Sequence, residues 1–118
     1  MLGNMFTHTV HVPGTLAANI TVVFTVPVDC TLIHASAVGS NANSGLLILG
    51  NTSNDDAYLE SASIGDSSAP AEFAQSNFVG GQFPRLLKGT VFSATLDFDG
   101  AGGTATQNFT LSLTFLEG

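Results

Sequence analysis

Residues 107–116 read QNFTLSLTFL, and this stretch constrains the fold more than any other part of the chain. Apolar and hydroxyl side chains alternate through it, and on a β-strand successive side chains point to opposite faces. The apolar row consists of Phe109, Leu111, Leu113 and Phe115, and the polar row of Thr110, Ser112 and Thr114. The pattern predicts a sheet strand with one apolar face and one polar face.

The same period of two recurs along the chain, with turn residues between the alternating stretches. We expect about eight strands and no amphipathic helix. The strands are expected at residues 6–12, 18–26, 30–38, 46–49, 72–74, 89–99 and 107–116, while residues 57–64 form either a strand or one turn of helix. A chain of 118 residues has the length of one domain, so residues 1–118 are expected to share one core.

These strands predict an all-β fold. The return of a long strand late in the chain favours a jelly-roll β-sandwich of about eight antiparallel strands. An Ig-like sandwich is the alternative, although its Cys…Trp…Cys pattern is absent because the chain has one cysteine and no tryptophan. Residues 89–99 and 107–116 are expected to form a hairpin, with the glycine-rich stretch 100–103 at its tip.

The chain is poor in charge and acidic. Nine acidic and two basic residues give a formal net charge of -7. Binding to DNA, RNA or an anionic membrane surface needs several lysines or arginines, so we exclude nucleic-acid and membrane partners. A surface with so few charges also suggests that neighbouring subunits cover much of it, which favours a homo-oligomer, a trimer or a dimer. A monomer kept soluble by net charge and hydroxyl groups is the alternative.

No set of residues points to catalysis or to a cofactor. His8 and His11 are three positions apart, so on a strand they would face opposite sides and could not chelate one metal together. The acidic pairs Asp97/Asp99 and Asp55/Asp56 are candidates for calcium, but solvated carboxylates are commoner at such positions. We therefore expect no enzyme activity, no cofactor and no metal site.

Two other residues are expected to be structural. His34 lies in a predicted strand, where a hydrogen-bonded histidine is favoured over a ligand. Cys30 has no cationic neighbour in sequence to stabilise a thiolate, so a small buried apolar residue is expected.

The amino-terminal residues carry no basic residue before an apolar block, so they do not form a signal peptide, and synthesis in the cytoplasm is expected. Residues 1–7 are a candidate extended arm that contacts a neighbour through Leu2, Met5 and Phe6, the alternative being a disordered start. Arg85 and Lys88 are a candidate contact to an acidic neighbour, the alternative being a solvated turn.

Two stretches resemble small virion proteins of tailed bacteriophages. Residues 96–118, LDFDGAGGTATQNFTLSLTFLEG, are similar to the ending of such proteins, and residues 22–38 are similar to their early strands. Some of these proteins are capsid cement or decoration proteins with jelly-roll folds. The resemblance implies a virion protein that lies on the outer capsid surface, binds across joints between major capsid protein subunits and stabilises the shell.

A receptor- or carbohydrate-binding sandwich of a phage tail or fibre is the alternative function. Sugar sites usually need exposed aromatic side chains. The chain offers Tyr58, no tryptophan, and nine phenylalanines that mostly lie in apolar register. Composition therefore favours the capsid protein.

Overall fold

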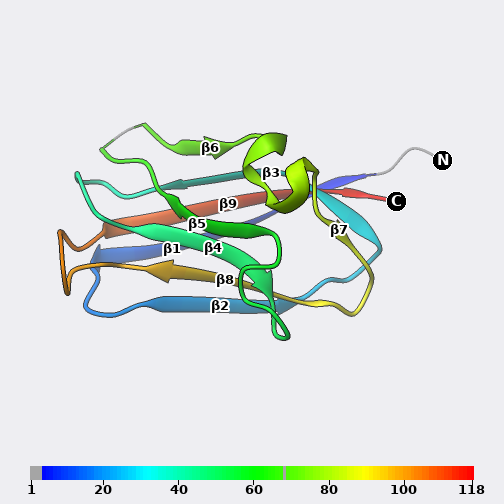
Figure 1. Ribbon diagram of the computed structural model, residues 1–118, viewed down its shortest axis with the longest axis horizontal. Coiled ribbons are helices and arrows are strands. Elements are labelled where there is room, and N and C mark those ends of the chain that lie inside the picture. The colour runs from blue at the N-terminus through cyan, green and yellow to red at the C-terminus, as the bar shows by residue number, and fades with distance from the viewer. Residues whose placement is uncertain (1–3, 68) are drawn as a thin grey trace.

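A computed structural model describes residues 4–67 and 69–118 and shows two antiparallel sheets packed face to face. One sheet has the order β1-β9-β3-β6, with β7 also paired to β3, and the other has the order β2-β8-β4-β5 (Figure 1). The strands are β1 (Met5–Thr15), β2 (Ile20–Thr25), β3 (Cys30–Val38), β4 (Leu46–Asn51), β5 (Leu59–Ser63), β6 (Ala71–Phe73), β7 (Arg85–Leu86), β8 (Val91–Asp97) and β9 (Gln107–Glu117). Two short 3₁₀ turns, η1 (Gln75–Asn77) and η2 (Val79–Gly81), lie between β6 and β7. The predicted all-β antiparallel sandwich is confirmed.

The strands pair in a nested order along the chain. Strand β1 pairs with β9, β2 with β8, β3 with β6 and β7, and β4 with β5. Two further pairings, β3 with β9 and β8 with β4, join these units within each sheet. The first half of the chain is thus matched to the second half in reverse order, and early residues lie beside late ones.

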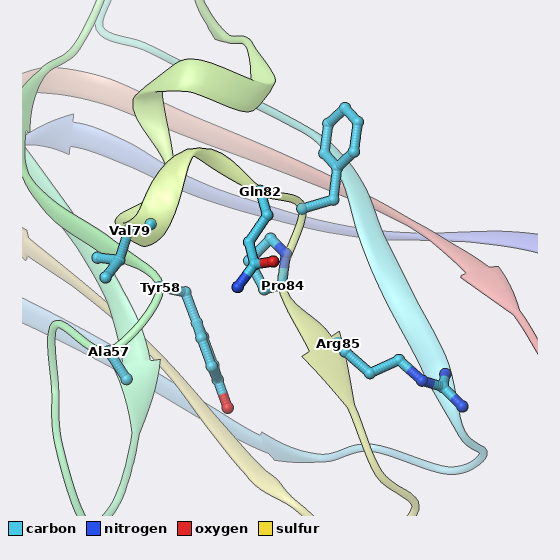
Figure 2. A pocket seen from close by; sticks show the side chains of 8 residues that line it. Ala57, Tyr58, Val79, Gln82, Pro84 and Arg85 are labelled. Atoms are coloured by element: carbon cyan, nitrogen blue, oxygen red, sulfur yellow. The ribbon is translucent and has the colours of Figure 1, made fainter.

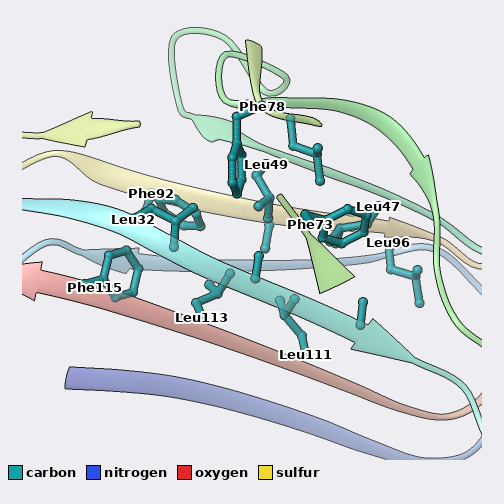
Figure 3. Packing of buried hydrophobic residues seen from close by; sticks show 14 of the residues in the cluster. Leu32, Leu47, Leu49, Phe73, Phe78, Phe92, Leu96, Leu111, Leu113 and Phe115 are labelled. Atoms are coloured by element: carbon teal, nitrogen blue, oxygen red, sulfur yellow. The ribbon is translucent and has the colours of Figure 1, made fainter. Parts of the chain in front are cut away.

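Strand β9 lies between β1 and β3, and its inward side chains form the floor of the core. Its apolar row is buried as the alternation predicts. The inward side chains of β8 pack against it from the other sheet (Figure 3), and the rings of Phe92 and Phe115 meet edge to face with centroids 5.9 Å apart. Edge-to-face aromatic contact adds to the stabilisation that burial alone supplies.

The expected hairpin between residues 89–99 and 107–116 is wrong. Both strands exist, but β8 belongs to one sheet and β9 to the other, so the connection between them crosses the sandwich. Hydrogen bonds join this β8–β9 connection to the loop that follows β3. Asn41 Oδ1 accepts the Gln107 N–H at 3.0 Å, and Thr104 O accepts the Ser44 N–H at 2.9 Å. The glycine-rich stretch 100–103 is therefore part of a connection between the two sheets. It is not the turn of a hairpin.

Strand β3 contains a bulge that shifts its alternation. Leu32 pairs with Phe115, and the next partner pair is His34 with Thr114, so one extra residue lies on β3. Leu32 is buried before the bulge and Ala35 after it, with two half-buried residues between them. A bulge of this kind keeps small side chains in the core while the strand bends.

Residues 46–49 are all apolar, which predicts a strand buried on both faces, but β4 is fully buried on one face only. Leu47 and Leu49 are buried, whereas Leu46 and Ile48 on the outer face are only half-buried.

The candidate arm at residues 1–7 is part of the sheet from Met5 onward. Met5, Phe6 and Thr7 pair with Leu116, Phe115 and Thr114 of β9. Met1–Gly3 lie outside the described residues.

We predict that replacing Leu113 with alanine will lower the free energy of unfolding by about 2–5 kcal/mol, because it opens a cavity at a fully buried leucine. Ser112→Ala is the matched control, since Ser112 lies on the outward row of the same strand and should change stability by less than about 0.5 kcal/mol. Urea unfolding measures both. Equal losses for the two variants would contradict the assignment of the faces.

We also predict that Cys30 will not react with a thiol reagent in the native protein at pH 8. Cys30 is 0% exposed, and burial raises the pKa of its thiol more than nearby Arg85 lowers it. The reactive thiolate is therefore scarce as well as inaccessible. Absorbance with a disulfide reagent should show one thiol per chain only after denaturant is added. Fast reaction of the folded chain would show that the residue is exposed.

Candidate functional site: a docking surface at the terminal end

A row of outward-facing residues crosses the β1-β9-β3 sheet at the end where β1 begins and β9 ends (Figure 1). Met5 pairs with Leu116, Leu116 with Thr31, and Thr31 with Arg85. Neighbouring strands are about 4.8 Å apart, so Met5 and Arg85 lie about 14 Å from each other. The nested pairing brings together residues that are 80 positions apart in sequence.

Exposed apolar side chains gather in and beside this row. Met5 is 66% exposed, Leu116 is 39% exposed, and Leu87, two residues beyond Arg85, is 61% exposed. We call Met5, Leu116, Arg85, Leu87 and Lys88 the terminal patch. Contiguous exposed apolar groups with polar neighbours are typical of protein interaction sites.

Both basic residues of the chain lie in the terminal patch. Among the described residues, the only ion-pair contact joins His34 and Glu72. Neither Arg85 nor Lys88 therefore forms an ion pair there. The Arg85 guanidinium donates a hydrogen bond to the Gly118 carbonyl, and the Lys88 backbone N–H donates to Asp29 Oδ1 at 2.8 Å. Among the described residues, no hydrogen bond or ion pair holds the Lys88 ammonium, so its charge is available to an acidic group of another protein, whereas the Arg85 guanidinium already contacts Gly118.

The predicted interface residues have different placements. The structure brings Met5, Arg85 and Lys88 to one end of the sandwich, and all three are exposed. Phe6 points the other way and stacks on Phe115 with ring centroids 5.0 Å apart. Leu2 lies outside the described residues.

Sequence reasoning missed Leu116 and Leu87. A signal was present, because each follows directly after a residue that faces the core, Phe115 and Leu86. An apolar residue next to an inward one must point outward on a strand. A leucine that breaks an otherwise strict alternation therefore marks an exposed apolar position.

A second feature of the surface is the distribution of charge. The chain carries no Asp, Glu, Lys or Arg before Asp29. Strands β1 and β2, which both lie within this uncharged part, form one edge of each sheet, β1 in the first and β2 in the second. The inward residues of both edges are only half-buried, with the His8 ring stacked on Phe24 at a centroid distance of 4.1 Å. We call these two strands the uncharged edge.

The other candidates from the sequence are structural. His8 and His11 do face opposite sides, since His8 stacks on Phe24 while His11 Nδ1 lies 2.8 Å from Thr110 Oγ1 on the outer face. The hydrogen-bonded role of His34 is confirmed by its Nε2, 3.0 Å from Glu72 Oε1. Each of these stacking or hydrogen-bond contacts joins two different strands, which gives the three histidines a structural role.

The acidic pairs do not gather around a common point. Asp97 Oδ1 accepts the backbone N–H of Asp99 at 3.1 Å, and Asp99 has left the strand with a φ of 44°. Within residues 4–67 and 69–118, no group of three or more His, Cys, Asp or Glu side chains has an arrangement that could hold a metal ion. Over the same residues, no helix has the length and apolar character needed to cross a membrane.

A hollow of about 390 Å³ lies beside η2 (Figure 2). Tyr58, Gln82 and Arg85 supply its polar groups, and Val79 and Pro84 are among its apolar ones. Tyr58 is held from two sides, because its hydroxyl lies 3.1 Å from Asn51 Nδ2 and its ring stacks on Phe92. Two half-buried aromatic residues, Tyr58 and Phe83, therefore line the hollow.

No protein-family model matches the chain, and no curated protein matches it. A solved structure to which it is similar is a chain of the cyanophage Pam1 capsid asymmetric unit, with 14% sequence identity and a TM-score of 0.53. The match covers 99% of this chain and 87% of that chain, so the two have similar lengths. This similarity shows a fold shared over nearly the whole chain.

Proposed function

We propose that the chain is a structural virion protein of a tailed bacteriophage, and more specifically a cement or decoration protein. In this role it binds the outer capsid surface across joints between major capsid protein subunits and stabilises the shell. The observation that carries the proposal is the shared fold with a chain of a cyanophage capsid unit over 99% of this sequence. The similarity of residues 96–118 to the endings of small virion proteins points the same way.

The charge distribution supports a place on the outside of the shell. Packaged DNA attracts proteins rich in lysine and arginine. This chain has two basic residues and a formal net charge of -7, so DNA would repel it. An outer position separates the protein from the genome.

The terminal patch is the surface that we assign to the capsid. Exposed Met5, Leu116 and Leu87 would fill apolar hollows of the partner, and Arg85 and Lys88 would meet acidic groups at the rim. Each contact is modest, at about 25 cal/mol per Å² of apolar surface buried. Contacts to two joined subunits reinforce one another, because binding the first raises the effective concentration for the second. A small protein can thereby hold a joint closed.

The topology supports the finer fold assignment that accompanies this function. We assign the sandwich as a jelly roll because the chain pairs as one long hairpin, β1 with β9 through β4 with β5, wrapped so that successive strand pairs fall in alternate sheets. An Ig-like sandwich would instead carry its strands in ABED and CFG sheets.

A receptor- or carbohydrate-binding module is less well supported. Its best site would be the hollow beside η2, where the Tyr58 ring stacks on Phe92 and the Phe83 ring packs against Phe78. A sugar needs an aromatic face that is free to stack. Specific signals on a glycan array that Gln82→Ala abolishes would favour this module over the cement protein.

We predict that Leu87→Asp will weaken binding to capsid shells prepared without this protein by about tenfold or more, because a charge replaces an apolar contact at the interface. Leu87 is 61% exposed, so the folded state should tolerate the change. Co-sedimentation of the purified chain with the shells measures the affinity.

Val23→Asp is the matched control, since Val23 is 52% exposed on the outer face of the other sheet. It should bind like the unchanged chain. Equal weakening by both variants would remove the terminal patch from the proposal. No binding of the unchanged chain to any shell would remove the cement function itself.

A further inference from the structure

Strand β1 presents a long free edge that lacks the usual protection. It spans Met5–Thr15, and on its other side no strand pairs with it among the described residues. Natural sheet edges are normally short, charged, or interrupted by proline or a bulge, because a free row of N–H and C=O groups recruits other strands. From Met5 to Val12 the edge has no charged residue and no proline. The proline and the register shift come only after Val12.

The other edge of the same sheet is better protected. Strands β6 and β7 are only 3 and 2 residues long, and each has one exposed charged residue, Glu72 and Arg85. In the second sheet, β5 carries exposed Glu60. Of the free sheet edges, the uncharged edge therefore has the fewest features that oppose pairing with another chain.

The backbone groups that point outward from β1 can be identified. The Glu117 N–H donates to Asn4 O at 2.7 Å, and these two residues continue the register of β1 with β9. Because hydrogen-bonded pairs alternate in an antiparallel ladder, even-numbered residues of β1 bond to β9 and odd-numbered ones face away. The free groups therefore belong to Met5, Thr7, Thr9 and His11.

We propose that two copies of this chain associate through β1, antiparallel and related by a two-fold axis at Thr9. This contact rests on the self-association expected of the cement protein and gives it a defined geometry. Thr9 would exchange hydrogen bonds with Thr9 of the second copy, and Thr7 with the second copy's His11. The pairing ends at Pro13, which has no N–H to give.

The side chains of β1 are self-complementary in this register. Directly opposite residues in an antiparallel pair lie on the same face, so inward residues meet inward ones. Phe6 would lie opposite Val12 of the second copy, and His8 opposite Val10. All four are half-buried in the single chain, so pairing would remove further apolar surface from water.

The low charge of β1 favours a second copy as the partner. Two chains of net charge -7 repel each other, and the repulsion is least where the surfaces that approach carry no acid. The first acidic residue of the chain, Asp29, comes after both β1 and β2. Joining the two edges would give one continuous sheet across both sandwiches, in which neither copy leaves β1 unpaired.

Thr9→Pro tests the contact without disturbing the fold. The Thr9 N–H faces away from β9, so proline removes an edge donor but no hydrogen bond within the chain, a position that proline tolerates. We expect sedimentation velocity across a concentration series to show twice the 12.1 kDa chain mass for the unchanged protein. Thr9→Pro should raise the dissociation constant by at least about tenfold. Thr9→Val keeps the N–H and should dimerise normally.

Val23→Pro is the matched control on the neighbouring edge. The Val26 N–H donates to Thr90 O at 2.8 Å in the register of β2 with β8, so the Val23 N–H also faces away from its ladder. This variant should dimerise like the unchanged chain. Loss of the dimer in Val23→Pro, with Thr9→Pro unaffected, would overturn the assignment to β1.

Thr9→Cys provides a direct measure of the register. Directly opposed residues of a hydrogen-bonded pair have Cα atoms about 5.5 Å apart, within the range of a disulfide. Oxidation should give a covalent dimer, whereas the unchanged chain with buried Cys30 should not cross-link. A trimer, or a monomer that still binds capsid shells, would overturn this contact while leaving the proposed function intact.

Discussion

The structure depends on the burial of one strand between two others. Strand β9 pairs on one side with β1 and on the other with β3, and its inward row packs against β8 of the opposite sheet. This arrangement places the end of the described chain at the centre of a sheet. Without β9, strands β1 and β3 would lose their shared neighbour, and the core would lose the apolar row that covers one side of it. Early and late residues must therefore fold together.

The same alternation determines what the outside of the molecule looks like. Every inward apolar row leaves an outward row, and on β1, β9 and β3 that row consists mainly of threonine, serine and histidine. Hydroxyl groups hydrogen-bond to a partner and are easier to desolvate than charges. Three of the five large apolar residues that are exposed in the described part of the chain, Met5, Leu116 and Leu87, lie at the terminal end with both basic residues. Such a surface suits lasting contact with other proteins.

The sequence predicted the strands well, because two-residue periodicity depends on local burial alone. It could not predict which sheet each strand joins, and this is why β8 and β9 were expected side by side. A glycine-rich connection fits a hairpin tip as well as a crossing, and the choice depends on hydrogen bonds from Asn41 and Ser44, some sixty residues away. For the same reason, the sequence predicted only some residues of the terminal patch. Met5 and Arg85 could be named as exposed candidates, but only the nested pairing places them in one row with Leu116.

The proposed function requires that other virion proteins cover part of this sandwich. A cryo-electron microscopy map of the particle that carries the chain tests it most directly. The account predicts density of the dimensions of this sandwich, 45 × 28 × 25 Å, on the outer surface over subunit joints, with the terminal patch facing the shell. Density inside the shell beside the DNA, or particles that contain no copy of the chain, would contradict it.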